Sequence, residues 1–207
     1  MLEFDPATLE KKDIYKLMIG AIIPRPIAWI TSQNAADVIN LAPFSYFNGV
    51  SSAPPMISVS FSRKPNGAQK DTLKNILHNH EFVAHIANFN QAKLVSLSAA
   101  EFEENQSELQ AVGLKIAESK KISVPGFQES AVRFECKFAN IVEIKKNGII
   151  TGELVLAEIV YFWIADSIYS DGRIDPKTLN PLARLAGDSY ANLGEIINEP
   201  IPKLSKN

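Results

Sequence analysis

The stretch that decides the fold packs aromatic residues densely among polar ones, Asn40-Leu41-Ala42-Pro43-Phe44-Ser45-Tyr46-Phe47-Asn48. Aromatic side chains this close together, with Ser45 and Asn48 among them, could wall a flat ring and hydrogen-bond its edge. They could equally form the end of a core strand, which is the commoner outcome for such a run taken alone. A turn over residues 33–37 precedes the stretch, so we expect a returning strand over residues 38–45.

Strand patterns lie on both sides of this stretch. Residues 56–62 alternate strictly between an apolar face and a hydroxyl face, Ile57, Val59 and Phe61 against Ser58, Ser60 and Ser62. Further strands are expected over 22–31, 81–87, 132–144 and 150–164, and Asn147-Gly148 is a strong hairpin signal between the last two. Helices are expected over 73–80, with Asp71 or Thr72 as N-cap, over 90–99, with Asn90 as cap, and over 107–112. Antiparallel strands interrupted by short helices predict a mainly β fold, a β-barrel with helical insertions.

Composition limits the classes of function. The chain has 207 residues, of which 46% are hydrophobic and 21% charged, so we expect one globular domain over residues 14–207. A polar lead-in over 1–13 precedes it, and an irregular tail with one short helix is expected over about 171–207. The net charge of −2 argues against a nucleic-acid partner. The longest apolar run, residues 154–165, is too short for a membrane helix and no signal stretch is present, so we expect a cytoplasmic protein without membrane contact.

Several well-known catalytic motifs are absent from the sequence. There is no G-x-G-x-x-G, no Walker A loop and no G-x-S-x-G, and no catalytic residue is assigned. His80 and His85 are one residue too far apart for a zincin helix, so no metal site is expected. We expect His80 in a loop and His85 partly buried and hydrogen-bonded. The single cysteine, Cys136, is expected to be a buried small hydrophobe because it lies on the apolar face of its strand.

Residues 60–72 carry the elements of an anion site. The hydroxyls of Ser60 and Ser62 lead towards Arg63, and Lys70 lies close by in the sequence. Thr72 is at a helix start, where free backbone N–H groups favour an anion. Asp71 has the wrong charge for this, so we assign it to a cap or to a basic partner. An exposed strand face, two solvated cations and an ordinary helix cap explain the same residues, and spacing leaves both interpretations open.

The order of these motifs resembles the flavin reductase-like, FMN-binding split-barrel family. The similarity covers roughly residues 14 to 200. It rests on these stretches: Pro24-Arg25-Pro26-Ile27-Ala28-Trp29-Ile30-Thr31, Asn40 to Asn48, Pro54-Pro55, Arg63 through Lys70-Asp71-Thr72, Glu129-Ser130 with Glu135-Cys136, Asp171-Gly172-Arg173-Ile174-Asp175, and Ala183-Arg184-Leu185-Ala186-Gly187.

The resemblance implies a split β-barrel, non-covalent FMN, and a homodimer with both FMN molecules near the subunit interface. Residues 40–48 would contact the isoalloxazine, residues 63–72 the phosphate, and the apolar strand 154–165 would fit the interface. The implied cofactor-binding residues are Trp29, Thr31, Asn40, Pro43, Phe44, Ser45, Tyr46, Phe47, Asn48, Ser60, Ser62, Arg63, Lys70 and Thr72. Arg184 and Tyr190 in the tail are weaker candidates.

The leading functional interpretation is an oxidoreductase. Hydride from NADH or NADPH would pass to the flavin, and electrons would leave to a second flavin, oxygen, a metal ion or a protein. The cofactor performs this chemistry and no acid or base is needed, which agrees with the absence of a triad. Two alternatives remain open, a flavoredoxin-like electron carrier to a partner protein and a flavin-binding protein without turnover.

Overall fold

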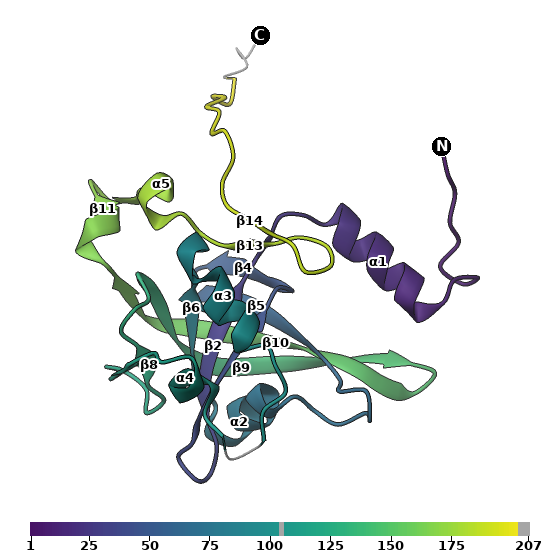
Figure 1. The fold of residues 1–207 in the computed structure, drawn as a ribbon, viewed down its shortest axis with the longest axis horizontal. Coiled ribbons are helices and arrows are strands. Elements are labelled where there is room, and N and C mark those ends of the chain that lie inside the picture. The colour runs from purple at the N-terminus through teal and green to yellow at the C-terminus, as the bar shows by residue number, and fades with distance from the viewer. Residues whose placement is uncertain (104–105, 203–207) are drawn as a thin grey trace.

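The fold is built on one seven-stranded antiparallel sheet in the order β3-β2-β6-β9-β10-β5-β4 (Figure 1). The computed structural model describes residues 1–103 and 106–202, so the end of the expected tail, residues 203–207, lies outside it. The bounds are β2 Ala28–Gln33, β3 Ile39–Phe44, β4 Phe47–Ser52, β5 Pro55–Ser62, β6 Glu81–Ile86, β9 Val132–Lys146 and β10 Ile149–Ile164. The mainly β fold with few helices that the sequence predicts is confirmed.

The two edge strands of this sheet, β3 and β4, are consecutive in the chain. Only Ser45 and Tyr46 separate them, and the Ser60 N–H donates to the Tyr46 carbonyl at 2.8 Å. β3 therefore also approaches β5, across the link. The sheet curls round so that its two edges meet at Ser45-Tyr46, and this link marks the split in the barrel.

Short helices and small sheets surround the barrel (Figure 1). The helices are α1 Lys11–Ala21, α2 Asp71–Asn79, α3 Ala92–Leu97, α4 Glu108–Ala111 and α5 Pro176–Leu179, with 3₁₀ turns at Phe89–Gln91 and Asp166–Ile168. The small strands are β1 Arg25–Pro26, β7 Ile116–Ala117, β8 Gly126–Phe127, β11 Tyr169–Ser170, β12 Arg173–Ile174, β13 Ala183–Arg184 and β14 Tyr190–Ala191. Among the described residues, no helix has the length and apolarity needed to cross a membrane.

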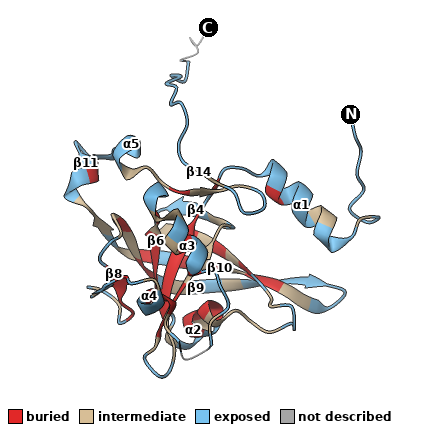
Figure 2. Cartoon of the chain, in the orientation of Figure 1, coloured by how far each residue is buried: buried red, intermediate tan, exposed pale blue. Residues whose placement is uncertain are grey.

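The alternation in β5 places its apolar face inside the barrel. Ile57, Val59 and Phe61 are at most 3% exposed, and they pack with Phe82, Cys136 and the inward face of β10. Buried residues concentrate on the central strands (Figure 2). β10 is thus buried on one face by the barrel core, while Leu154 and Leu156 on its other face are half-buried.

A second core lies outside the barrel wall. Trp29 and Leu41, on the outward faces of β2 and β3, pack against Val95 of α3, Leu109 of α4 and Leu182 of the tail. Trp29 meets Phe127 edge-on, with ring centroids 4.9 Å apart. This second core holds α3 and α4 beside β3, the strand that contains residues 40–44.

Two turn residues explain where the long hairpin between β9 and β10 forms. Asn147 and Gly148 both have positive φ, 53° and 80°, which confirms the predicted hairpin between β9 and β10. α1 begins at Lys11, inside the stretch expected to be a polar lead-in, and the sequence patterns did not predict it.

Two predicted helix caps are wrong. The N-cap of α2 is Lys70, and no side chain of the described residues caps this helix, because Asp71 pairs with lysines and Thr72 bonds Asn40. Asn88, and not Asn90, caps the turn that leads into α3, since its side chain accepts the Asn90 N–H.

Candidate functional site

Three cavities follow one another along residues 40–48. They have volumes of about 640, 410 and 370 Å³. The first two share Pro43, Phe44 and Lys70, and the last two share Ser45 and Tyr46. All residues from 40 to 48 line at least one cavity except Leu41, which is buried in the second core. The barrel's split therefore opens on a continuous row of hollows.

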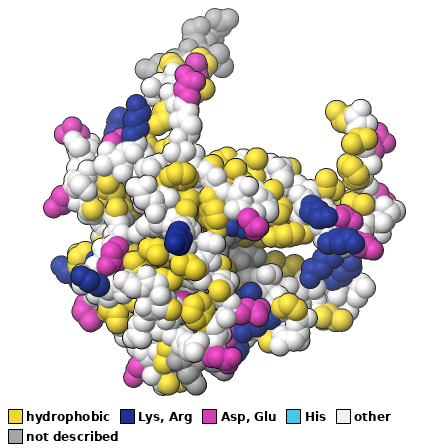
Figure 3. Space-filling view, in the orientation of Figure 1, with side chains coloured by type: hydrophobic (Ala, Val, Ile, Leu, Met, Phe, Trp, Pro, Cys, Tyr) yellow, Lys and Arg dark blue, Asp and Glu magenta, His cyan; other side chains and the backbone are white. Residues whose placement is uncertain are grey.

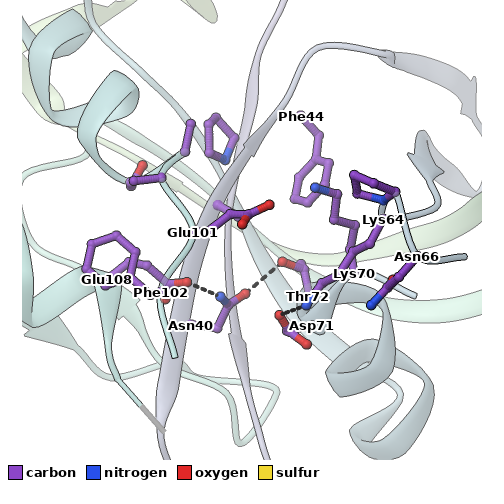
Figure 4. A pocket seen from close by; sticks show the side chains of 16 residues that line it. Asn40, Phe44, Lys64, Asn66, Lys70, Asp71, Thr72, Glu101, Phe102 and Glu108 are labelled. Atoms are coloured by element: carbon purple, nitrogen blue, oxygen red, sulfur yellow. Dashed lines mark hydrogen bonds and ion pairs between the residues drawn. The ribbon is translucent and has the colours of Figure 1, made fainter. Parts of the chain in front are cut away.

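The largest cavity carries cations at one end. Lys64 and Lys70 line it together with Asn66, Asp71 and Thr72 (Figure 4). The first intrahelical bond of α2 is from the Lys74 N–H to the Lys70 carbonyl. The N–H groups of residues 71–73 are therefore free of helical partners, and they add positive potential beside the two ammonium groups.

Asp71 reduces the positive charge at this end of the cavity. Its carboxylate pairs with Lys64 at 2.7 Å and with Lys74 at 3.0 Å. Burial raises the pKa of Asp71, but the hydrogen bonds from the two lysines outweigh it and leave the pKa below its usual value. Among the described residues, Lys70 has no carboxylate within ion-pair distance, so its charge is available to a ligand.

The other end of the largest cavity is formed by the segment between α3 and α4. Ser98, Glu101 and Phe102 line it there. Glu108 of α4 also lines it, and burial raises the pKa of this carboxyl above its usual value. Sequence patterns gave no signal for these residues, because they reach the cavity only through the packing of α3 and α4 on the outer wall.

The second cavity brings the hydroxyl face of β5 to the same row. Ser60 and Ser62 line it, with Lys70 at its border with the first cavity. Ser58, from the same face, does not line it. Tyr15 of α1 and Gly152 of β10 also contribute to its wall, and neither was predicted.

Arg25 lines the third cavity and hydrogen-bonds the segments around it. It is 5% exposed, and its guanidinium donates to the carbonyls of Ile19, Ile22 and Leu185 at 2.7–2.8 Å. Its Nε donates to Ser45 Oγ at 3.4 Å. One buried cation thereby ties α1, the tail and the split of the barrel together.

Other predicted site residues lie away from the cavities. Trp29 is in the second core, where its indole N–H donates to Ser98 Oγ at 2.9 Å. Thr31 is fully buried, and its hydroxyl donates to the Pro125 carbonyl at 2.7 Å. Both are on the outward face of β2, while the barrel interior takes Ala28 and Ile30.

Arg63 is engaged in a buried ion pair. Its guanidinium forms two hydrogen bonds with the Glu153 carboxylate of β10 and one with the Gly67 carbonyl. Glu153 is 2% exposed and also accepts a bond from Gln69 at 3.2 Å. Arg63 lines none of the three cavities.

The tail candidates interact with each other. The Arg184 guanidinium lies over the Tyr190 ring, 4.5 Å from its centroid, and donates to the Gly187 carbonyl. β13 pairs with β1 so that Arg184 lies opposite Arg25. The tail therefore reaches the border of the third cavity without lining it.

The histidines and the cysteine have structural surroundings. His80 ends α2 in a left-handed conformation, and His85 is fully buried, more than predicted, 3.3 Å from the Thr31 hydroxyl. Burial holds the pKa of His85 well below its usual value, with a smaller effect from Arg133. Cys136 is buried as predicted, and burial raises the pKa of its thiol.

The site suits a long ligand that is anionic at one end and flat along its length. The largest cavity, at 640 Å³, is within the usual range for small-molecule and cofactor sites. Its cations and free N–H groups fit a phosphate. Phe44, Tyr46 and Phe47 provide aromatic wall further along.

Comparisons with known proteins agree with this chemistry. Residues 19–176 match the family model described as flavin reductase like domain. Nitrilotriacetate monooxygenase component B from Bacillus cereus has a TM-score of 0.93 and 40% identity, covering 96% of this chain and 98% of its own. The 2-nitrobenzoate 2-nitroreductase NbaA from Pseudomonas fluorescens has a TM-score of 0.87 and 27% identity, covering 100% and 99%.

A third solved structure identifies the barrel type. A Shewanella frigidimarina protein with a split barrel domain has a TM-score of 0.82, covering 98% of this chain and 100% of its own, at 19% identity. That likeness shows the fold alone. The family match covers most of the chain and agrees with the cavities along the split. This chain is a flavin-related oxidoreductase and belongs to the flavin reductase-like split-barrel family.

Proposed function

We propose that this chain binds FMN non-covalently along residues 40–48 and acts as an NAD(P)H-dependent reductase. The observation that carries the proposal is the row of three cavities along this stretch, with Lys64 and Lys70 at one end. An apolar groove without cations would fit an uncharged flavin equally well. The two lysines at one end of the row are therefore the feature that favours FMN, the flavin with a phosphate.

Each part of the row has a part of FMN to hold. Lys70 and the N–H groups at the start of α2 bind the phosphate, and Lys64 adds charge behind them. The hydroxyls of Ser60 and Ser62 lie beside Lys70 for the polar chain. Phe44 and Tyr46 provide the wall for the isoalloxazine, whose edge takes polar partners from the split.

The protein's own contribution is position and the exclusion of water. Bound FMN supplies the redox chemistry, accepting hydride from a nicotinamide and releasing electrons to a second acceptor. The aromatic residues on either side of Ser45 keep the ring's surroundings apolar. No proton has to be moved by a side chain in the hydride step, so no catalytic acid or base is assigned.

The electron acceptor is the part of the proposal with the most alternatives. One relative is named as a monooxygenase component, and a component implies a separate oxygen-using partner. We therefore place reduced flavin delivery to another protein first among the acceptors. A second flavin, oxygen and a metal ion are the others.

Flavin binding and nucleotide oxidation test the proposal directly. Purified protein loaded with FMN is mixed without oxygen with NADH or NADPH, and the visible flavin absorbance is followed. We expect quenching of FMN fluorescence on binding, and bleaching by at least one nucleotide. Riboflavin serves as the matched ligand without phosphate.

The contrary outcomes separate the alternatives. A protein that leaves FMN fluorescence unchanged contradicts the flavin site. A flavin-loaded protein that neither nucleotide reduces contradicts the reductase, and tight retention of its flavin then supports the electron carrier. Retention without electron exchange with any protein partner supports flavin binding alone.

We further propose that the chain is a homodimer. α1 stands off the barrel (Figure 1), and apolar side chains are exposed along the N-terminal arm, residues 1–22 (Figure 3). Leu17, Met18 and Ile22 are 43–56% exposed there. Burial of such a surface against a second copy is favourable at about 25 cal/mol per Å².

Light scattering after gel filtration tests the dimer. We expect twice the chain mass for the wild type and a monomer for Leu17→Asp. Leu97→Asp is the matched control, because Leu97 is 48% exposed on α3, away from the arm. A wild-type monomer overturns the dimer proposal. The cytoplasmic location stays a prediction that cell fractionation checks.

A further inference from the structure

A chain of hydrogen bonds between buried side chains lies at the wall of the largest cavity, and Glu108 determines which groups in it donate and which accept. This residue is 8% exposed, and both of its carboxylate oxygens accept N–H groups. The Asn40 side-chain amide donates to one at 2.7 Å, and the Leu41 backbone N–H donates to the other at 3.0 Å. A protonated carboxyl would have to donate from an oxygen that already faces a donor, so Glu108 acts here as an acceptor only.

Glu108 therefore sets the orientation of the Asn40 amide. Its NH₂ group must face the carboxylate, which turns its oxygen towards Thr72 (Figure 4). That oxygen accepts from Thr72 Oγ1 at 2.7 Å and from Ser32 Oγ at 3.2 Å. Ser32 in turn accepts from the Asn75 side chain at 3.1 Å. The hydroxyl hydrogens of Thr72 and Ser32 therefore both point towards the Asn40 oxygen, while the Asn40 amide hydrogen points towards Glu108.

Thr72 is the one member of this chain, besides Asn40 and Glu108, that lines the cavity. A hydroxyl has one hydrogen and two lone pairs, and the hydrogen of Thr72 is committed to Asn40. Only lone pairs remain for a ligand. An ionised phosphate oxygen is an acceptor without a hydrogen to give, so the Thr72 hydroxyl cannot bond it without breaking the chain.

We propose that the Thr72 hydroxyl accepts a hydrogen bond from a hydroxyl of the ligand's polyol chain, and that Asn40 and Glu108 are positioning residues that enforce this. The inference rests on the proposed flavin site and assigns a role within it. The phosphate then takes Lys70 and backbone N–H groups, while the Thr72 side chain selects for an alcohol next to it.

Three flavins and two variants test this assignment. Dissociation constants are measured by fluorescence quenching for FMN, riboflavin and lumiflavin, which lacks the polyol chain. Thr72→Val keeps the shape and loses the hydroxyl, and Thr72→Ser keeps the hydroxyl. We expect Thr72→Val to weaken FMN and riboflavin equally, by about fivefold, the effect of one neutral hydrogen bond. Lumiflavin should be unchanged, and Thr72→Ser should bind like the wild type.

Other patterns overturn the assignment. A loss confined to FMN means that Thr72 donates to the phosphate. An equal loss for all three flavins, or no loss for any, means that its hydroxyl does not recognise the polyol chain.

The direction of the chain can also be measured without a flavin, which separates it from the proposed function. In ¹⁵N-labelled protein, the Asn40 side-chain NH₂ protons should exchange slowly with water because Glu108 holds them. Glu108→Ala should remove this protection, and Glu101→Ala, at the same cavity, should leave it. Fast exchange in the wild type, or protection that survives Glu108→Ala, overturns the direction even where flavin binds. A wild type with the protected amide that binds none of the flavins overturns the proposed function, and with it the ligand assigned to Thr72.

Discussion

Two groups of charges lie within ten residues of each other on the connection from β5 to α2, and the fold uses them differently. Arg63 is held by Glu153, which also accepts a hydrogen bond from Gln69, and it lines none of the three cavities. Lys64 and Lys70 line the largest cavity. The sequence presents all three as cations beside a helix start. The comparison shows that a buried carboxylate on a neighbouring strand makes Arg63 structural, while Lys70, which has no ion-pair partner among the described residues, is available to a ligand.

The largest effect is expected where the structural pair is broken. Glu153→Gln leaves the Arg63 guanidinium without its counter-charge in a largely buried place. Removal of one partner of a buried pair costs roughly 3–5 kcal/mol, so the free energy of unfolding should fall by about 3 kcal/mol. Urea unfolding of the flavin-free protein measures it.

An exposed pair gives the matched control for that experiment. Glu143 pairs with Lys145 at 2.7 Å on the β9–β10 hairpin, with both side chains about half exposed. Glu143→Gln should cost less than about 1 kcal/mol. Equal losses from the two variants would mean that Arg63 is not locked by Glu153 and is available as a phosphate ligand.

The next effect belongs to the cavity side of the comparison. Lys70→Ala should weaken FMN by about ten- to hundredfold, the range for a charged hydrogen bond of ~1.5–3 kcal/mol, and leave riboflavin unchanged. Titration by fluorescence quenching measures both ligands. Lys177→Ala, on α5 and lining none of the three cavities, should change the affinity for neither flavin. Equal weakening of both flavins by Lys70→Ala would place Lys70 away from the phosphate.

A smaller effect of opposite sign is expected at Asp71. Its carboxylate neutralises Lys64 at the cavity, so Asp71→Asn should strengthen FMN by a few-fold, as expected for a partly exposed ion pair of about 1 kcal/mol or less. Riboflavin affinity should not change. A variant that binds FMN more weakly would show that Asp71 positions Lys64 and does not compete with the ligand.

The smallest effect is the pH dependence of the same carboxylate. The pKa of Asp71 is lower in the folded chain than in the unfolded chain, so its contribution is present above about pH 4 and is lost as the pH falls through the folded value. Wild type should be more stable than Asp71→Asn by less than about 1 kcal/mol at neutral pH. Unfolding free energies measured across the acid range should converge, and a difference that stays constant with pH would contradict the assignment.

The sequence predicted what depends on local periodicity. The alternation of β5, the Asn147-Gly148 hairpin and the burial of Cys136 all follow from patterns within a few residues, and all are confirmed. The row of cavities lies along residues 40–48, the stretch chosen for its aromatic density, and the role of these residues in binding stays a prediction.

Long-range partners could not be predicted in this way. Glu153 meets Arg63 across 90 positions, and Glu108 meets Asn40 across 68. Sheet register and helix packing create both contacts, and neither leaves a mark on the local pattern. Trp29 illustrates the same limit, because the face of β2 that it occupies was decided by α3 and α4 covering the outer wall.

The two-residue link between β3 and β4 has a consequence for the thermodynamics of ligand capture. Ser45 and Tyr46 are held at both ends by strands, and Tyr46 is held again by its backbone bond from Ser60. A wall fixed in this way before the ligand arrives has little conformational freedom left to lose. The entropy of ordering this part of the site has already been spent during folding, so ring affinity depends on contacts and desolvation.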